Sequence, residues 1–266
     1  AATTLWNNDF TKSLSVKDTA INLQNNFDNL VSIQNQDNTK ITSLTQTNNS
    51  ALITLNTSQY SAGRDSGIYS KLNKGISNLA ITNASVSDVT GSVGLRLGAE
   101  SRVKSISIID STDNIDNGIN ALQNVGMKIK TISQNNVGID NVLELDATEI
   151  KNDASVLGKI ITGYQLAAQN TAASQLSAML ANRKVITIDV KDSATNISRN
   201  WDSLNKINSA INFVEVSDSD AAIKIKATQL AVSQNLIDKF KVPSGVTGKT
   251  GAFKLEISEA TASQVE

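Results

Sequence analysis

The sequence has no cysteine and no histidine among its 266 residues, and it has one proline. Without cysteine the protein can form neither disulfides nor thiolate metal sites, and it has no cysteine nucleophile. Without histidine it lacks the commonest metal ligand and general base, which removes the Ser-His-Asp triad, His-ligated haem and histidine-based zinc sites. The composition therefore argues against most hydrolytic, redox and metal-dependent catalysis.

Aromatic residues make up 4% of the chain, which suits stacked short elements with small side chains better than a globule built around large rings. The net charge is −1, and the two signs are interspersed. Since there is no basic stripe, we expect neither nucleic acid nor an anionic membrane as the main partner. No run of about 18 apolar residues is present, so membrane insertion is not expected either.

What the sequence does contain is one pattern that occurs three times. The pattern joins an apolar residue, an Asp, a Ser or Thr, an Asn and further apolar residues, and its copies span residues 16–30, 108–122 and 190–204. Their aspartates are Asp18, Asp110 and Asp192, which lie 92 and then 82 residues apart. Tandem copies usually stack into a body whose role is reach, surface or assembly.

Each copy predicts a helix that starts at the aspartate. Apolar residues fall five, nine, twelve and fifteen positions after it, and steps of four, three and three mark one helix face. The Asp itself is predicted to be the N-cap, because its side chain can accept an unpaired N–H of the first turn. The predicted face is Leu23, Phe27, Leu30 and Ile33 in the first copy; Ile115, Ile119, Leu122 and Val125 in the second; and Ile197, Trp201, Leu204 and Ile207 in the third.

Short β-branched runs surround these helices, and the full copy reads strand, helix, strand, strand, helix, strand, helix. The first strands are predicted at 104–109 and 184–190, and the strands after the helix at 40–44, 128–132 and 210–216. The next strands are predicted at 51–55, 141–145 and 222–225. A second helix is predicted from Ser58, Thr148 and Thr228, with an apolar face that includes Tyr60, Ile150 and Leu230 and closes on Leu72, Ile160 and Phe240. Last come strands at 79–81, 164–166 and 253–257, and a third helix near 170–181 in the second copy.

Alternation of strands and helices favours parallel strands with crossover helices. In tandem copies it predicts an α/β fold of the tandem-repeat solenoid type, with a leader at 1–13 and repeats at 14–103, 104–184 and 185–266, the last incomplete. A closed barrel and a doubly wound sheet are the competing α/β folds. The solenoid is preferred because a stack tolerates copies whose lengths differ by ten residues better than a closed barrel does.

The repeated unit, carried best by residues 190–197 and 227–230, resembles the repeats of very large bacterial surface proteins exported by type I secretion. The resemblance covers nearly the whole chain from about Leu14. It implies a secreted, cell-surface or extracellular-matrix location and a structural or adhesive role, and it supplies no catalytic residues. The glycine-aspartate nonapeptides that bind calcium in many such proteins are absent, so calcium-driven folding is not supported.

Several polar motifs have both a functional and a structural interpretation. Asn26 with Asp28, and Asn200 with Asp202, could bind an ion or a sugar, but the polar face of a helix explains them more simply. The acidic loop at 217–220 offers oxygen ligands for calcium, yet it lacks the glycine and glutamate of an EF-hand and reads as a solvated turn.

Two other motifs are resolved in the same way. The run at 245–251 contains Gly-Lys-Thr, but Pro243 stands where a phosphate-binding loop needs glycine, so a plain loop is predicted. Trp201 occupies a helix-face position held elsewhere by Phe27 and Ile119, which favours a core residue over a platform for sugars.

Three functions remain open. The leading prediction is a self-assembling structural subunit, such as a filament or surface-layer protein, with no catalytic residues, cofactor or metal. The alternative is an adhesin or carbohydrate-binding module whose partners are surface glycans. The third is an enzyme that uses carboxylates alone, which would need two acids facing each other across a cleft.

The two ends of the chain predict where subunits meet. Leu5, Trp6 and Phe10 lie in a polar leader outside the repeats, and the third copy stops near Val265 before its last helix and strand. Incomplete ends that complete each other would give a head-to-tail contact that propagates into a fibre. The other interpretation is that the sequence is a piece of a longer repeat array.

Overall fold

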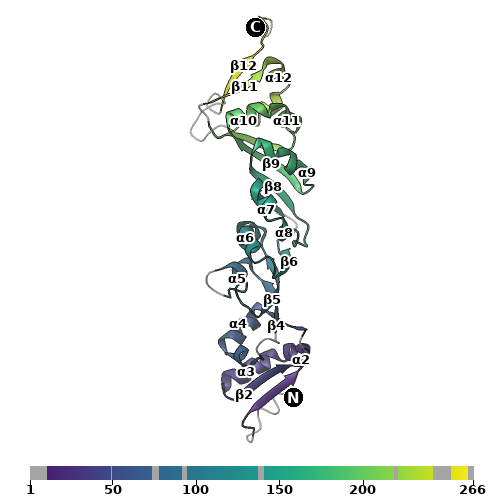
Figure 1. Ribbon diagram of the computed structural model, residues 1–266, viewed down its shortest axis with the longest axis vertical. Coiled ribbons are helices and arrows are strands. Elements are labelled where there is room, and N and C mark those ends of the chain that lie inside the picture. The colour runs from purple at the N-terminus through teal and green to yellow at the C-terminus, as the bar shows by residue number, and fades with distance from the viewer. Residues whose placement is uncertain are drawn as a thin grey trace. The chain divides into compact units, whose positions relative to one another are not determined.

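The computed structural model of the protein describes residues 11–48, 50–73, 78–91, 95–136, 141–218, 221–241 and 253–262. The chain divides into two compact units, Ala1–Val137 with Ser155–Thr162 and Gly138–Ala154 with Gly163–Glu266. Both units are α/β, and in both a strand leads through a helical segment into the next parallel strand (Figure 1).

The first unit holds a two-stranded and a four-stranded sheet, each in chain order. The strands are β1 (Leu14–Asp18) and β2 (Ile41–Gln46), then β3 (Leu52–Asn56), β4 (Asn78–Ala84), β5 (Val103–Asp110) and β6 (Ile129–Gln134). The helices are α2 (Ala20–Asn25), α3 (Phe27–Gln36), α4 (Thr57–Asp65), η1 (Ile68–Lys71), α5 (Val86–Thr90) and α6 (Thr112–Asn124).

The second unit is organised in the same way. Its four-stranded sheet contains β7 (Val142–Asp146), β8 (Gln165–Thr171), β9 (Val185–Asp192) and β10 (Ile211–Val216), and its two-stranded sheet contains β11 (Ala222–Lys226) and β12 (Lys254–Ser258). The helices are α7 (Ala147–Asn152), η2 (Ala173–Gln175), α9 (Leu176–Ala181), α10 (Ala194–Arg199), α11 (Trp201–Lys206), α12 (Ala227–Ala231) and α13 (Gln234–Ile237). Helix α8 (Ala154–Leu157) begins with the last residue of the segment Gly138–Ala154, and its other residues belong to the first unit.

Every strand pairing in the described part of the chain is parallel, and each of these strands pairs with a neighbour in the sequence. Parallel neighbours cannot be joined by a tight hairpin, so a helical crossover connects most of them. Three single parallel bridges extend the pairing: Leu44–Leu72, Ile132–Ile160 and Val214–Phe240. The prediction of an α/β fold with a mostly parallel sheet and crossover helices is confirmed.

The helix faces predicted from the sequence lie in the core. The residues five positions after each aspartate, Leu23, Ile115 and Ile197, are at most 2% exposed, and so are those at the twelfth position, Leu30, Leu122 and Leu204. Strand residues such as Ile106 and Ile188 are fully buried as well. The face is weaker at the fifteenth position, where Val125 and Ile207 are half-buried.

Other details of the prediction were wrong. The N-cap is the residue after each aspartate, namely Thr19, Ser111 or Ser193, because its hydroxyl accepts the N–H of the third helical residue. The second helices begin one residue earlier than predicted and end long before the bridge residues Leu72, Ile160 and Phe240. The third helix begins at Ala173, because Asn170 and Thr171 still belong to β8.

Candidate functional site

The aspartate at the end of each first strand organises a corner. Oδ1 of Asp110 accepts hydrogen bonds from the N–H of Ser111 at 2.8 Å and from the amide of Asn114 at 2.7 Å. The corners at Asp18 and Asp192 repeat both bonds with the equivalent residues, at 2.6–2.8 Å. Each aspartate therefore fixes the direction in which its strand enters the helix.

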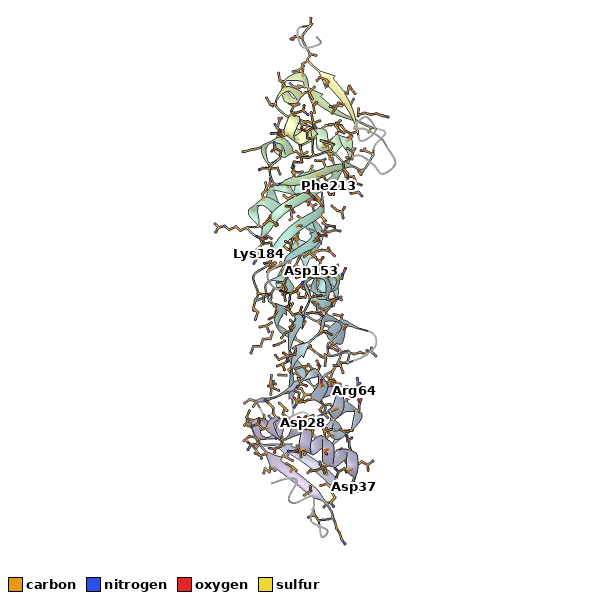
Figure 2. All side chains as sticks on the ribbon, turned by 180° about the vertical axis from the view of Figure 1, so that it is seen from behind. Asp28, Asp37, Arg64, Asp153, Lys184 and Phe213 are labelled. Atoms are coloured by element: carbon orange, nitrogen blue, oxygen red, sulfur yellow. The ribbon has the colours of Figure 1, made fainter. Side chains whose placement is uncertain are left out.

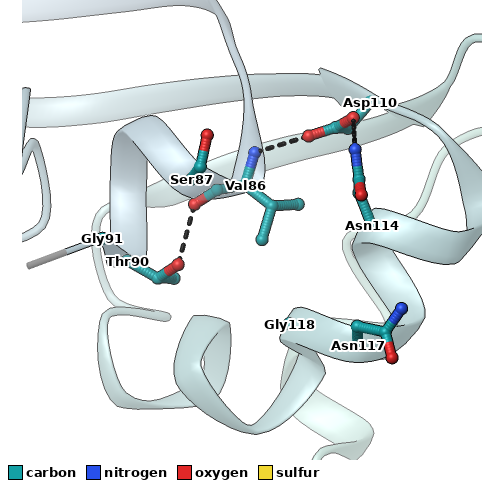
Figure 3. Close-up of a pocket in the computed structure, with 8 residues that line it drawn as sticks. All are labelled: Val86, Ser87, Thr90, Gly91, Asp110, Asn114, Asn117 and Gly118. Atoms are coloured by element: carbon teal, nitrogen blue, oxygen red, sulfur yellow. Dashed lines mark hydrogen bonds between the residues drawn. The ribbon is translucent and has the colours of Figure 1, made fainter. Parts of the chain in front are cut away.

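In two of these corners the second carboxylate oxygen reaches the preceding turn of the chain. Oδ2 of Asp110 accepts the N–H of Val86, the first residue of α5, at 2.8 Å (Figure 3). Oδ2 of Asp192 accepts the N–H of Ala173, the first residue of η2, at 2.9 Å. The carboxylate thus fastens one strand–helix turn to the next. The sequence carried a signal only for the bonds of Oδ1 within each corner, since an Asn follows each aspartate by four residues.

Side-chain oxygens from later turns satisfy other helix N-termini. Asn48 Oδ1 accepts the N–H of Ala20 at 2.7 Å, and Asn136 Oδ1 accepts that of Thr112 at 3.0 Å. Asp218 Oδ1 accepts the N–H of Ala194 at 2.6 Å. These donors are ones that a first helical turn cannot satisfy by itself. Asp218, which the sequence offered as a calcium ligand, is thus part of the same bonding scheme.

An open groove of about 360 Å³ lies beside the corner at Asp110 in the first unit. Its lining comes from α5, the end of β5 and α6 (Figure 3): Val86, Ser87, Thr90, Gly91, Asp110, Asn114, Asn117 and Gly118. Its polar groups largely bond to protein, since Thr90 donates to the carbonyl of Val86 and Asn117 to that of Asp113. With one carboxylate in its lining, the groove offers no acid pair for general acid–base catalysis.

Carboxylates on the outer face of the second unit's sheet are also bonded to amides. Gln169 donates to Glu144 at 2.7 Å, and Asn212 donates to Asp189 at 2.9 Å. Burial raises the pKa of Asp189, while the hydrogen bond from Asn212 lowers it and the nearby Glu144 raises it. Glu144 and Asp189 stand on β7 and β9 with β8 between them, so these acids stabilise strand-to-strand contacts.

Two cationic side chains in the first unit bind backbone carbonyls. Lys128 Nζ donates to the carbonyls of Gly98 and Glu100, both at 2.7 Å, and Lys159 Nζ donates to those of Gly126 and Ile129. Burial lowers the pKa of Lys128, and the neighbouring Lys104 lowers it further. Since Lys128 donates to two backbone carbonyls, we interpret it as a residue that holds neighbouring loops together.

The strand edges differ in how they are covered. Thr54 N–H at the edge of β3 donates to the side chain of Gln24 at 3.0 Å, and Lys224 N–H at the edge of β11 donates to Ser198 at 2.8 Å. Helices therefore close these two edges. Each of β1 and β12 pairs on one side, and in the described residues neither has a strand on the other side.

The predicted site residues fall in two groups. Leu5, Trp6, Phe10 and Val265, and the loop at 245–251, lie outside the described residues. Asp28 and Asp202 lie on helices and accept hydrogen bonds from Gln59 and Gln229. Trp201 is fully buried and donates to Ser233 at 2.9 Å, which confirms its place in the core.

In the described part of the chain, no cluster of three acidic side chains could hold a metal ion. None of the helices described there is long and apolar enough to cross a membrane. No protein family, curated protein or solved structure matches the chain.

Proposed function

We propose that this protein is a structural subunit that associates with copies of itself head to tail and has no catalytic role. In this proposal the fold is a tandem-repeat α/β solenoid whose three repeats add successive parallel strands. The observation that carries it is that β1 and β12, the first and last described strands, each have one edge with no strand partner among the described residues. An edge of this kind is a ready template for a strand from another chain.

The order of the strands supports the solenoid over its competitors. Both four-stranded sheets run in chain order, whereas a doubly wound sheet reverses its strand order at a switch point. The carboxylate chemistry supports a structural role, because Asp110, Asp192 and Asp218 accept main-chain N–H groups. Asp189 and Glu144 are bonded to amides in the same way.

The proposed location is the bacterial cell surface or extracellular matrix. It rests on the likeness of residues 190–197 to the repeats of exported surface proteins and on the absence of cysteine. An adhesin that grips surface glycans is the alternative.

Electron microscopy of the purified protein over a range of concentrations tests the proposal. We expect fibres or lattices for the full chain, and loss of assembly without loss of the fold when residues Ala1–Phe10 are deleted. A chain that stays monomeric at high concentration contradicts self-association, and monomers that bind glycans support the adhesin. Normal fibres from the deletion variant would show that the leader is not part of the contact.

A further inference from the structure

Two strand pairings within the chain share one register. In both β4–β5 and β8–β9 the second strand skips one residue after the first pair. Before the last pair the first strand skips two residues and the second strand skips one. The pairs are Leu79–Val103, Ala80–Ser105, Ile81–Ile106 and Ala84–Ile108 in the first unit, and Leu166–Val185, Ala167–Thr187, Ala168–Ile188 and Thr171–Val190 in the second. The second strand of each pair ends on a corner aspartate, Asp110 or Asp192, as β1 ends on Asp18.

Strand β12 is equivalent to β4 and β8 in its pairing with the strand before it. Leu255 pairs with Ile223 on β11, as Leu79 pairs with Ile53 and Leu166 with Leu143. Four residues after these leucines the backbone becomes left-handed in all three cases, at Asn83 (φ 58°), Asn170 (φ 45°) and Glu259 (φ 58°). Such a φ is uncommon outside glycine, so its recurrence shows that β12 ends as β4 and β8 do.

The bond that follows this left-handed residue is made twice and is missing once. Three residues after Asn83 and Asn170, the N–H groups of Val86 and Ala173 donate to Oδ2 of Asp110 and Asp192. The equivalent donor after Glu259 is the N–H of Ala262, and the equivalent acceptor is Oδ2 of Asp18. Among the described residues neither has a hydrogen-bond partner, although Oδ1 of Asp18 makes both of its usual bonds.

The apolar residues at these two edges are incompletely covered. Ile106, Ile108, Ile188 and Val190 are fully buried, whereas their counterparts on β1, Leu14 and Val16, are half-buried. On β12, Ile257 is 41% exposed, and its counterparts Ile81 and Ala168 are 1% exposed. Each edge therefore presents the side chains that the other edge would cover.

We propose that β12 of one copy pairs in parallel with β1 of a second copy in the register of β4–β5 and β8–β9. Ile257 then faces Leu14, Glu256 faces Ser13 and Ala260 faces Val16, while Oδ2 of Asp18 accepts the N–H of Ala262. The added strand contributes main-chain hydrogen bonds, and the corner carboxylate fixes the register. This assignment rests on the proposed self-association and names the surfaces that carry it.

Disulfide cross-linking tests the register. Because the sequence has no cysteine, only the introduced cysteines can form a disulfide. Two single variants, Ser13→Cys and Glu256→Cys, are mixed and oxidised, and the linked peptides are identified by mass spectrometry. Paired residues on adjacent strands lie about 5 Å apart, within the range of a disulfide. We therefore expect a peptide that joins position 13 to position 256.

Cysteine variants at two other positions of β1 serve as controls for the register. Lys17→Cys lies four residues from position 13, about 13 Å along the strand, so it should not link to Glu256→Cys. Ser15→Cys reports a slip of two residues. A dominant link from position 15 or 17 to position 256, or no link to position 256 in a sample that sediments as oligomers, overturns the register while self-association stands. A sample that sediments only as monomers overturns both.

The corner carboxylate has its own test. Asp18→Asn keeps an oxygen for Thr19 and Asn22 but replaces the Oδ2 acceptor by an amide donor. We expect the association constant to fall about tenfold to a hundredfold, the usual weight of a hydrogen bond to a charged group. Asp28→Asn removes the same charge from α3 and should leave association unchanged. If the two variants associate equally well, Asp18 has no part in the contact.

Discussion

Helix α6 in the first unit and the helix pair α10–α11 in the second begin alike and diverge at the middle. Both start at an Asp-Ser corner whose hydroxyl accepts the N–H of Asn114 or Asn196. Helix α6 then runs unbroken through Gly118, whereas α10 ends at Arg199. Its C-cap Asn200 leaves the helix at φ −108° and ψ 13°.

The residues at the middle of each helix also differ between the two units. A Cβ atom at Gly118 would collide with Val86 on α5. The first unit therefore has a large side chain on α5 and no side chain at the facing position of α6. In the second unit the smaller Ala173 stands at the position of Val86, and Asn200 stands at that of Gly118. The corner thus sets where each helix begins, and the two units differ at the middle residue and at the residue in the place of Val86.

The largest expected effect tests whether the two helices have equivalent cores. Leu122→Ala and Leu204→Ala should each reduce the free energy of unfolding by about 2–5 kcal/mol, because both leucines are fully buried. Urea denaturation of the two variants measures this. A loss below about 0.5 kcal/mol in either variant would mean that its leucine is not in the core.

Placing the residue of the second unit in the middle of α6 tests directly why the two helices differ. Gly118→Asn should destabilise the protein by about 1–3 kcal/mol, since the new side chain overpacks against Val86. Val86→Ala in the same chain recreates the combination found in the second unit and should recover most of that loss. Additive effects of the two substitutions would show that these positions do not interact.

The indole of Trp201 gives the second unit a bond that Ile119 cannot make. Ser233→Ala removes the acceptor of its N–H, and a buried donor left unpaired costs about 1–3 kcal/mol. Thermal unfolding of Ser233→Ala beside the Trp201→Phe/Ser233→Ala double variant separates the lost bond from lost packing. Equal costs of Ser233→Ala with and without the indole N–H would contradict a bond of this size.

The smallest expected effect concerns two carboxyls with opposite pKa shifts (Figure 2). Burial and the nearby Glu149 raise the pKa of Asp153, so ionisation costs stability as pH rises above the ordinary value of 3.8. Hydrogen bonds from Thr39 lower the pKa of Asp37, so its contribution is lost as pH falls below that value. Relative to the unsubstituted protein, Asp153→Asn should be more stable at pH 7 than at pH 3, and Asp37→Asn should show the opposite trend. The same trend in both variants would refute this.

Periodicity predicted the elements well because the helix faces are apolar at regular steps and the strands are β-branched. It could not predict that Asp110 serves the N–H of Val86, since that bond joins residues 24 positions apart in sequence. The breaks at Asn26 and Asn200 were missed because the three copies share one apolar spacing, whether or not the helix is interrupted.

In the proposed assembly the edges of β1 and β12 join copies of the chain. Sedimentation velocity of the full chain and of Asp18→Asn, at matched concentrations, tests it most directly. We expect the full chain to form a series of oligomers that grows with concentration, and Asp18→Asn to need about ten times the concentration or more for the same distribution. A single monomeric species for the full chain at every concentration would contradict the claim.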